Sequence, residues 1–183
     1  MSWDKAPWRE CAPDLTQERL EHNVQGMVDR MQGRCLDLGC GTAKQMGYIG
    51  LDHYPFPGVN IVRDLRRGLP FDDDSIDSIY SAHCFEHFAG EDLIFLIEEC
   101  WRVSKPGAEW TIIVPDATSP NMHKDPMHCS YWYEESFDLW RVNEQGEYLI
   151  FVGPGYGRRA KLEVLGTVVN ANKDRLYRLR VIK

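Results

Sequence analysis

A buried strand that runs into a glycine-rich turn constrains the fold of this chain more than any other feature. Residues 34–38 are mostly apolar and have the length of a strand that is covered on both faces, and Gly39-Cys40-Gly41 follows directly. Glycine has no Cβ atom, so the backbone of such a turn can approach a ligand closely. A ligand bound there lies at the carboxyl end of the strand, where open α/β sheets bind their ligands.

The rest of the chain alternates between strand-like and helix-like segments. Counting residues 34–38 as the first strand, we expect the second, third and fourth strands at residues 48–52, 60–62 and 76–80. A helix at residues 91–104 and a fifth strand at 110–114 follow. Apolar residues at helical spacing over 20–31 predict another helix before the first strand, with Asp14 as its cap. Residues 162–169 and 176–182 predict a β-hairpin. This order predicts an α/β domain with a mainly parallel sheet and a C-terminal antiparallel hairpin.

Two connections depart from a regular α/β unit. Between Gly39 and Tyr48 there is room for one helical turn, whereas a complete crossover with its helix needs about 10–12 residues. We therefore expect the first crossover helix to be vestigial. Residues 115–130 contain three prolines and no apolar period, which predicts a long ordered loop, and the aromatic residues Tyr133, Phe137 and Trp140 indicate a short helix after it.

Carboxylates follow the second and third predicted strands. Asp52 closes the second strand, where a carboxylate can accept hydrogen bonds from both hydroxyls of a ribose, and Asp64 follows the third. The dinucleotide pattern G-x-G-x-x-G is not met, because Lys44 stands where its third glycine would fall. The spacing therefore argues against a dinucleotide and in favour of another nucleoside ligand.

Taken together, these motifs resemble the class I S-adenosylmethionine (SAM)-dependent methyltransferases, specifically the small methyltransferase-domain group. The resemblance covers residues 34–114. It rests on seven ordered motifs: Leu36-Asp37-Leu38-Gly39-Cys40-Gly41-Thr42, Gly50-Leu51-Asp52, Arg63-Asp64-Leu65, Leu69-Pro70-Phe71, Ser75-Ile76-Asp77-Ser78-Ile79-Tyr80, Glu86-His87 and Trp101-Arg102-Val103-Ser104-Lys105-Pro106-Gly107. It implies a Rossmann-like sandwich, SAM as cofactor and S-adenosylhomocysteine as product.

The resemblance also implies which residues contact SAM. The methionine part of SAM would face Asp37, Gly39, Cys40 and Gly41, and the ribose would face Asp52 and His53. The adenine would face Asp64 and Leu65, and the reactive sulfonium side would face Ser81 and His83. In one place the sequence departs from the family, because Ala43 replaces its third turn glycine. The methionine carboxylate is therefore expected to be held differently, with Lys44 or the N-terminal helix as candidates.

The length and composition favour one domain over residues 1–183. We expect a helical lead-in at residues 1–33 and a cofactor-binding core at 34–114. An acceptor-side loop and helix should follow at 115–145, and C-terminal strands at 146–183. The acceptor pocket is expected to include Trp132, whereas Phe137 and Trp140 are expected to pack in the core.

The segment after the fourth strand carries the candidate residues on the acceptor side. If it is helical, His83, Glu86 and His87 share one face, and His128 is a fourth candidate. Three roles stay open. In the first, Glu86 and His87 stabilise the local structure and orient the acceptor. In the second, the four residues bind a divalent metal. In the third, His87, His128 or His83 acts as a general base. The arrangement resembles the Glu-x-x-Glu-His motif and distant histidine of metal-dependent O-methyltransferases. The match is partial, because His83 stands in place of the first glutamate, and we do not expect a metal.

The expected reaction is transfer of the methyl group of SAM, by in-line displacement, to an oxygen or nitrogen of a small or medium-sized acceptor. From the length of the chain we expect no separate recognition domain. One alternative is a SAM-binding protein that does not transfer methyl groups, either a regulatory module or an enzyme that cleaves SAM. Another is a nucleic-acid methyltransferase that uses the basic C-terminal hairpin.

Charge and composition weigh on these alternatives. The formal net charge is −7, but residues 158–183 carry eight basic and two acidic residues, so this tail is +6 and the remainder −13. We expect a solvated hairpin face there rather than a polyanion site, and no nucleic-acid or membrane partner. The N-terminus lacks a signal peptide and the six cysteines form no Cys-x-x-Cys pair, so we expect a cytoplasmic protein with free thiols. The oligomeric state stays open.

Overall fold

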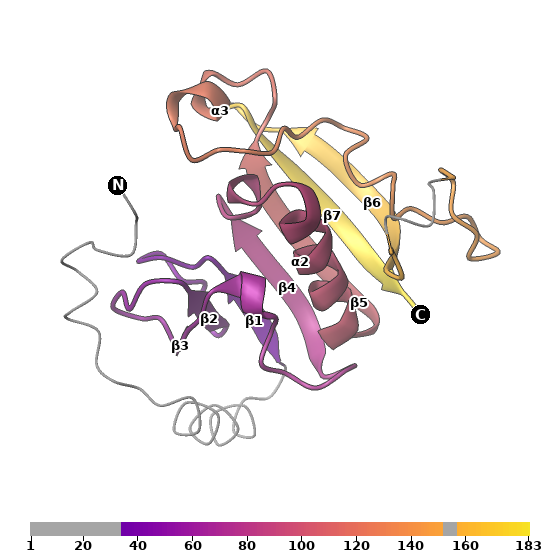
Figure 1. Ribbon diagram of the computed structural model, residues 1–183, viewed down its shortest axis with the longest axis horizontal. Helices are drawn as coiled ribbons and strands as arrows, with labels where there is room; N and C mark the ends of the chain where they lie inside the picture. The colour runs from indigo at the N-terminus through magenta and orange to yellow at the C-terminus, as the bar shows by residue number, and fades with distance from the viewer. Residues whose placement is uncertain (1–33, 152–156) are drawn as a thin grey trace. The chain divides into compact units, whose positions relative to one another are not determined.

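The computed structural model describes residues 34–151 and 157–183, and within them the chain forms a mixed α/β fold around one sheet (Figure 1). The predicted helix over residues 20–31 and its cap Asp14 lie outside the described residues. The sheet has seven strands in the order β3-β2-β1-β4-β5-β7-β6. They are β1 Cys35–Leu38, β2 Ile49–Asp52, β3 Ile61–Val62, β4 Ile76–Ala82, β5 Ser104–Pro115, β6 Lys161–Val169 and β7 Asp174–Ile182.

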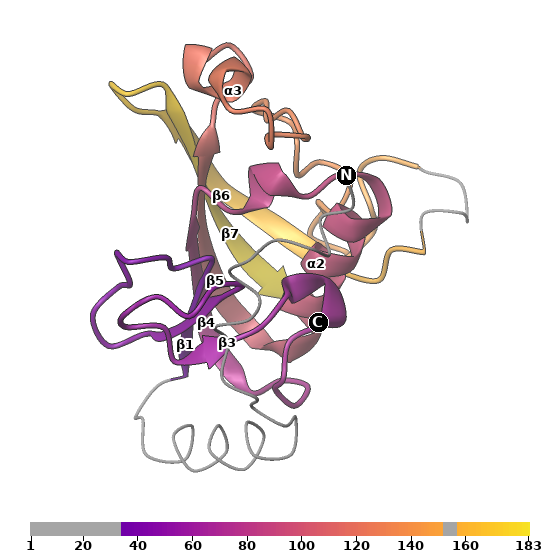
Figure 2. The same ribbon diagram turned by 60° about the vertical axis from the view of Figure 1, so that its left-hand side comes forward.

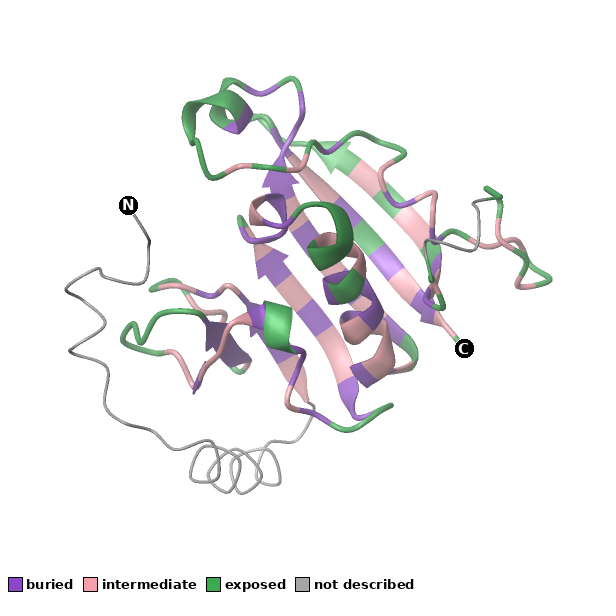
Figure 3. Cartoon of the chain, in the orientation of Figure 1, coloured by how far each residue is buried: buried purple, intermediate pink, exposed green. Residues whose placement is uncertain are grey.

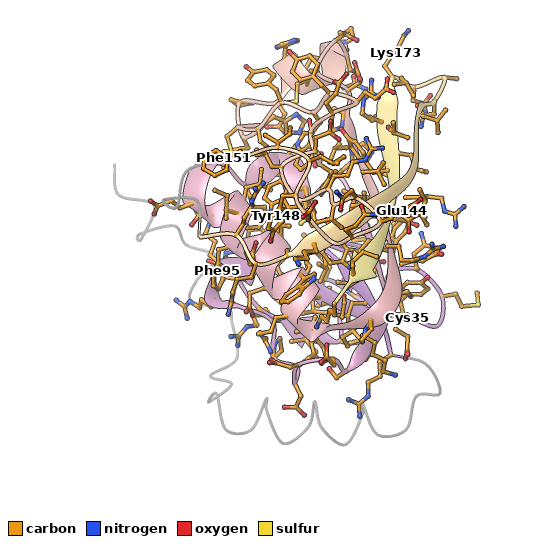
Figure 4. All side chains as sticks on the ribbon, turned by 90° about the vertical axis from the view of Figure 1, so that its right-hand side faces the viewer. Cys35, Phe95, Glu144, Tyr148, Phe151 and Lys173 are labelled. Atoms are coloured by element: carbon orange, nitrogen blue, oxygen red, sulfur yellow. The ribbon has the colours of Figure 1, made fainter. Side chains whose placement is uncertain are left out.

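Strand β7 runs in the opposite direction to the other six strands of the sheet. Strands β1 to β5 pair in parallel, whereas β7 runs antiparallel to both β5 and β6. The mainly parallel sheet and the C-terminal hairpin are therefore confirmed. Lys173 ends the hairpin turn with a φ of 65°, and Figure 4 shows this residue at the tip of the hairpin. Its carbonyl accepts a hydrogen bond from the N–H of Asp116, which ties the tip to the end of β5.

Helix α2, Gly90–Val103, lies across the strands on one face of the sheet (Figures 1 and 2). Leu96, Ile97 and Cys100 of α2 are buried, which is the apolar stripe expected of an amphipathic helix. The helix ends as predicted, but β5 begins at Ser104 rather than at Trp110. Ser104 pairs with Ile76 of β4, and the register then shifts, so Pro106 and Gly107 are accommodated at an irregularity within the strand.

The acceptor-side segment differs from the sequence-based prediction in two respects. The predicted loop contains a short helix, α3 Pro120–Lys124, whose N-cap Ser119 accepts a hydrogen bond from the N–H of Asn121. The predicted helix near Phe137 is wrong, because residues 134–140 form successive turns. The N–H of Trp140, for example, bonds the carbonyl three residues back, at Phe137, at 3.0 Å.

The aromatic residues Trp132, Phe137 and Trp140 of this segment join the core, whereas Tyr131 and Tyr133 are exposed. Trp132 is only 2% exposed, and its ring packs against Phe85, Phe137 and Tyr177. The expectation that Trp132 lines the acceptor pocket is therefore wrong, whereas Phe137 and Trp140 are buried as predicted. In Figure 3 the buried residues concentrate in the strands, and α3 with the loop around it is mostly exposed.

Candidate functional site

The glycine turn after β1 lies directly against the ends of the neighbouring strands. The N–H groups of Gly39 and Cys40 both donate to the carbonyl of Leu51 in β2, at 2.8 and 3.1 Å. A Cβ atom on Gly39 would lie 2.5 Å from the side chain of Cys84, and the φ of Gly39 is 68°. Both the close approach and the left-handed backbone require glycine at this position.

Asp52 connects the glycine turn to the end of β2. One carboxylate oxygen accepts the N–H of Gly41 at 2.8 Å, and the other accepts the N–H of Tyr54 at 2.9 Å. A carboxylate has about four lone-pair sites, so both oxygens can still accept a ligand hydroxyl. The exposed ring of His53 lies beside Tyr54, with 4.8 Å between the ring centroids.

Asp37 holds the shortened connection between β1 and β2. Its carboxylate accepts the N–H of Gln45 at 2.7 Å, and residues 39–48 form turns with no helix, which confirms the vestigial crossover. Burial raises the pKa of Asp37, and the Gln45 hydrogen bond and the Lys44 charge counteract this only in part. A buried acid whose ionised form is disfavoured gains from a nearby cation, such as a ligand ammonium group.

Lys44 and Cys40 cover the middle of β2. The Lys44 ammonium group donates to the carbonyl of Tyr48 at 3.0 Å, and a Cβ atom on Gly50 would lie 2.4 Å from the Lys44 side chain and 2.7 Å from the Cys40 sulfur. Burial, followed by the charges of Asp37 and Asp52, raises the pKa of Cys40 to about 11. Its thiol is therefore neutral at physiological pH.

The remaining sequence-predicted cofactor residues lie at the same edge of the sheet. Asp64 caps the 3-10 helix η3, Leu65–Arg67, by accepting the N–H of Arg66 at 3.0 Å, and Leu65 is buried. The buried hydroxyl of Ser81, near the end of β4, donates to the carbonyl of Leu38 at 2.9 Å and so joins β4 to β1. No structural observation tests their contacts with SAM, which stay predictions.

His83 leaves β4 in a left-handed conformation, with a φ of 56°. A non-glycine residue in this region is strained, and such strain is often found at functional sites. His83 is not part of one helix with Glu86 and His87, because the 3-10 helix η4 covers only Phe85–His87. Nevertheless, its Nδ1 lies 3.4 Å from Glu86 Oε1. The contact with Glu86, opposed by burial, raises the pKa of His83.

Glu86, His87 and His128 come together although the loop that carries His128 is distant in the sequence. Glu86 is 0% exposed, and among the described residues neither of its oxygens has a hydrogen-bond partner. Potential ligand atoms of the three residues, one from each, lie within 4.8 Å of one another. Three of the four sequence-predicted metal candidates therefore form one cluster, and His83 stands beside it.

The loop is fixed to η4 through the backbone of Glu86. The Glu86 carbonyl accepts the N–H groups of Cys129 and Ser130, at 2.8 and 3.2 Å, and the Ser130 hydroxyl donates to the carbonyl of Phe85 at 3.2 Å. Asp174, at the start of β7, is buried with its Oδ2 3.9 Å from His83 Nε2. The sequence contains no motif that points to Asp174, since hairpin pairing alone brings it to this edge.

The basic C-terminal strands are largely neutralised by ion pairs. Arg178 and Arg180 both contact Glu109, at 2.9 and 3.4 Å, and Arg175 contacts Asp116 at 2.6 Å. These pairs leave less positive charge for a polyanion than the sequence alone suggests. Within residues 34–151 and 157–183, no helix is long and apolar enough to cross a lipid bilayer.

Comparison with known proteins shows which family these elements resemble. A family model described as a methyltransferase domain matches residues 36–112, from β1 into β5. A methyltransferase-like protein of Schizosaccharomyces pombe is 28% identical over 145 residues, which cover 67% of this chain and 54% of that protein. A phthiotriol/phenolphthiotriol dimycocerosates methyltransferase of Mycobacterium tuberculosis is 28% identical over 119 residues, covering 52% of this chain and 42% of that protein. The chain spans about half the length of these relatives.

Among solved structures, a SAM-dependent methyltransferase from Archaeoglobus fulgidus has a similar fold. Its TM-score is 0.55 at 18% sequence identity, and the alignment covers 89% of this chain and 93% of that chain. At this identity the similarity concerns the fold alone. The predicted Rossmann-like methyltransferase architecture is confirmed.

Proposed function

We propose that the protein, whose residues 36–112 match a methyltransferase-domain family model, transfers the methyl group of SAM to an oxygen or nitrogen atom of a small or medium-sized acceptor. The observation that carries this proposal is the hydrogen bond between Gly41 and Asp52. It brings the glycine turn and the acid after β2 together at the carboxyl edge of the sheet. This is where an open α/β sheet binds a nucleoside.

The family resemblance suggests the cofactor contacts, and this arrangement supports them. Asp52 would accept the ribose hydroxyls, and the buried Asp37 would interact with the ammonium group of the methionine part. Asp64 and Leu65 would lie at the adenine end, and the turn from Ser81 to His83 would face the sulfonium. The neighbouring order β3-β2-β1-β4 supports this layout, because it places the ends of these four strands in one row.

In the proposed reaction, a lone pair of the acceptor atom attacks the methyl carbon as the bond from that carbon to sulfur breaks. The products are the methylated acceptor and S-adenosylhomocysteine. Holding donor and acceptor in line supplies much of the acceleration, and no nucleophile of the enzyme is required. If the acceptor atom carries a proton, His87, His128 or His83 is a candidate to accept it.

The alternatives from the sequence gain no support from the structure. The family match and the relatives do not favour a SAM-binding protein without transfer activity. The ion pairs of the C-terminal strands weigh against a nucleic-acid substrate. The acceptor is expected to be a small molecule.

Calorimetric titration with SAM and S-adenosylhomocysteine tests the cofactor assignment. Asp52→Asn should weaken binding of both by about 10–100-fold, because hydrogen bonds to a charged group contribute about 1.5–3 kcal/mol and 1.4 kcal/mol is tenfold in affinity. The matched control is Asp72→Asn, a change of an exposed aspartate outside the site. Equal affinities for Asp52→Asn and the parent protein would contradict the assignment.

Methyl transfer is tested with SAM labelled in its methyl group. The label should move to a hydroxyl or amine acceptor within a panel of small molecules, and SAM incubated with protein alone should stay intact. Accumulation of a SAM cleavage product without any acceptor would overturn the proposal in favour of a SAM-cleaving enzyme.

A further inference from the structure

We propose that Glu86, His87 and His128 form a binding site for one divalent transition-metal ion of the zinc class. The three residues come from η4 and from the loop after α3, and their ligand atoms lie within 4.8 Å of one another. Two imidazoles and one carboxylate are a donor set used by catalytic zinc sites and by other borderline divalent ions. Ion binding at this site does not depend on the methyl-transfer proposal.

The carboxylate of Glu86 is the first observation that points to a cation. It is completely buried, and no described residue donates a hydrogen bond to either of its oxygens. A buried ionised carboxylate without hydrogen bonds carries a large desolvation cost unless it is paired or coordinates a metal. Two imidazole nitrogens lie within 4 Å of Glu86 Oε1, His83 Nδ1 at 3.4 Å and His128 Nε2 at 3.9 Å.

The hydrogen bond of His87 is the second observation. Its Nδ1 lies 3.2 Å from the carbonyl oxygen of Met127, and a carbonyl can only accept. Nδ1 therefore carries the proton in the neutral ring, and the lone pair is on Nε2. Metal-binding histidines commonly use this arrangement, because a hydrogen bond from one ring nitrogen to a carbonyl orients the other nitrogen toward the ion.

His128 completes the group. Its ring centroid is 4.9 Å from that of His87, and its Nδ1 is buried with no hydrogen-bond partner among the described residues. The N–H of His128 bonds the carbonyl of Asp125, and Cys129 and Ser130 bond Glu86. These backbone contacts hold the His128 imidazole next to the Glu86 carboxylate.

The charges around the cluster also favour a cation. Asp125 Oδ2 lies 3.8 Å from His128 Nε2, and the buried Asp174 lies next to His83. The nearby guanidinium group of Arg175 is already paired with Asp116. The carboxylates of Asp125 and Asp174 therefore lie close to the imidazoles that surround Glu86.

The geometry favours a zinc-like ion over magnesium. Zinc binds imidazole nitrogen at about 2.0–2.1 Å, so the three ligand atoms would move slightly closer together on binding. Magnesium prefers oxygen ligands in an octahedral arrangement, which two imidazoles do not provide. Three protein ligands leave at least one coordination position open for water or for an oxygen of the acceptor.

Calorimetric titration of the full chain, freed of metal by a chelator, with Zn²⁺ and with Mg²⁺ tests the site. We expect one Zn²⁺ per chain and much weaker binding of Mg²⁺. Glu86→Gln, His87→Ala and His128→Ala should each weaken Zn²⁺ binding by more than about 100-fold, because a change in the second shell alone costs 10–100-fold. His123→Ala is the matched control, since His123 is exposed in α3 and lies outside the cluster.

Thermal unfolding separates loss of the site from loss of the fold. Zn²⁺ should raise the melting temperature of the parent protein and of His123→Ala but not that of Glu86→Gln. Without metal, Glu86→Gln should melt at the same temperature as the parent or higher, because the variant no longer buries a carboxyl group that lacks hydrogen bonds. Binding of S-adenosylhomocysteine by each variant confirms that it is folded.

Either of two results overturns the metal site: no Zn²⁺ binding by the parent chain, or binding that is unchanged in Glu86→Gln and His128→Ala. Failure of the methyltransferase proposal looks different, because the parent would then bind Zn²⁺ but neither SAM nor S-adenosylhomocysteine.

Discussion

The backbone N–H of Gly41 donates a 2.8 Å hydrogen bond to the carboxylate of Asp52, which joins the turn after β1 to the end of β2. The carbonyl of Leu51, one residue earlier, accepts two further N–H groups from the same turn. The two strand ends are therefore connected without the usual crossover helix between them. This explains how a short first connection still positions the residues of the proposed cofactor site.

Replacing Gly39 by alanine should destabilise the protein by about 2–4 kcal/mol, through left-handed strain and overpacking together. The new Cβ atom would lie 2.5 Å from the side chain of Cys84, at a φ of 68°. Gly107→Ala is the control, because Gly107 has a φ of 80° with nothing within 4 Å of the added atom. Urea unfolding of both variants measures the difference in the free energy of unfolding. Equal losses of stability in the two variants would show that Cys84 moves away freely.

Asp37→Asn should stabilise the protein at pH 7 and weaken SAM binding. Burial, only partly opposed by the Gln45 hydrogen bond, raises the pKa of Asp37, so folding disfavours the ionised form. The stabilising contribution of the protonated acid is present at low pH and is lost as the pH rises through the raised pKa. The gain in stability should therefore shrink on acidification. Thermal unfolding between pH 4 and 8 checks this, and a variant less stable than the parent at pH 7 would contradict it.

The ion pair between Asp116 and Arg175 should contribute to stability at neutral pH. Asp116→Asn leaves the largely buried guanidinium group without its partner, at a cost of about 3 kcal/mol. Burial alone would raise the pKa of Asp116, but hydrogen bonds from Thr118 and the pair with Arg175 outweigh it, so this pKa is lowered. The stabilisation is present above the unfolded pKa of about 3.9 and is lost as the pH falls through the lowered folded pKa.

Denaturant unfolding of Asp116→Asn at pH 7 and in acid measures this effect. The difference from the parent should narrow as the acid is protonated in both states. Asp77→Asn serves as the control, because Asp77 pairs with Lys105 at the surface and its loss should cost less than about 1 kcal/mol. If Asp116→Asn lost as little stability as the control, Arg175 would have found another partner.

Glu98 should hold the segment before β6 onto helix α2. Its buried carboxylate accepts the N–H groups of Arg159 and Ala160, both at 2.9 Å, and the indole N–H of Trp140 at 3.3 Å. Glu98→Gln weakens these charge-assisted bonds, at a cost of about 2 kcal/mol. Hydrogen exchange at Arg159 and Ala160 should accelerate, whereas exposed Glu91→Gln should leave it unchanged. Unaltered exchange in Glu98→Gln would contradict this role.

The sequence predicted the features that depend on residues close together along the chain. The strand and turn from Cys35 to Gly41, helix α2 and the C-terminal hairpin follow from apolar periodicity and from glycine, and the structure confirms them. The predicted helix near Phe137 failed because aromatic residues at helical spacing do not reveal whether backbone hydrogen bonds reach three or four residues back. Trp132 was misplaced for a related reason, since burial depends on what packs over a residue.

Only the tertiary structure decided which distant side chains meet. The sequence by itself determined an α/β sheet with a glycine turn and acids at its carboxyl edge, because steric and hydrogen-bonding preferences of neighbouring residues are local. It left the role of Glu86, His87 and His128 open, because their contacts depend on how the loop after α3 folds back onto η4. That packing creates a buried carboxylate beside two imidazoles, and no pattern of neighbouring residues encodes such a contact.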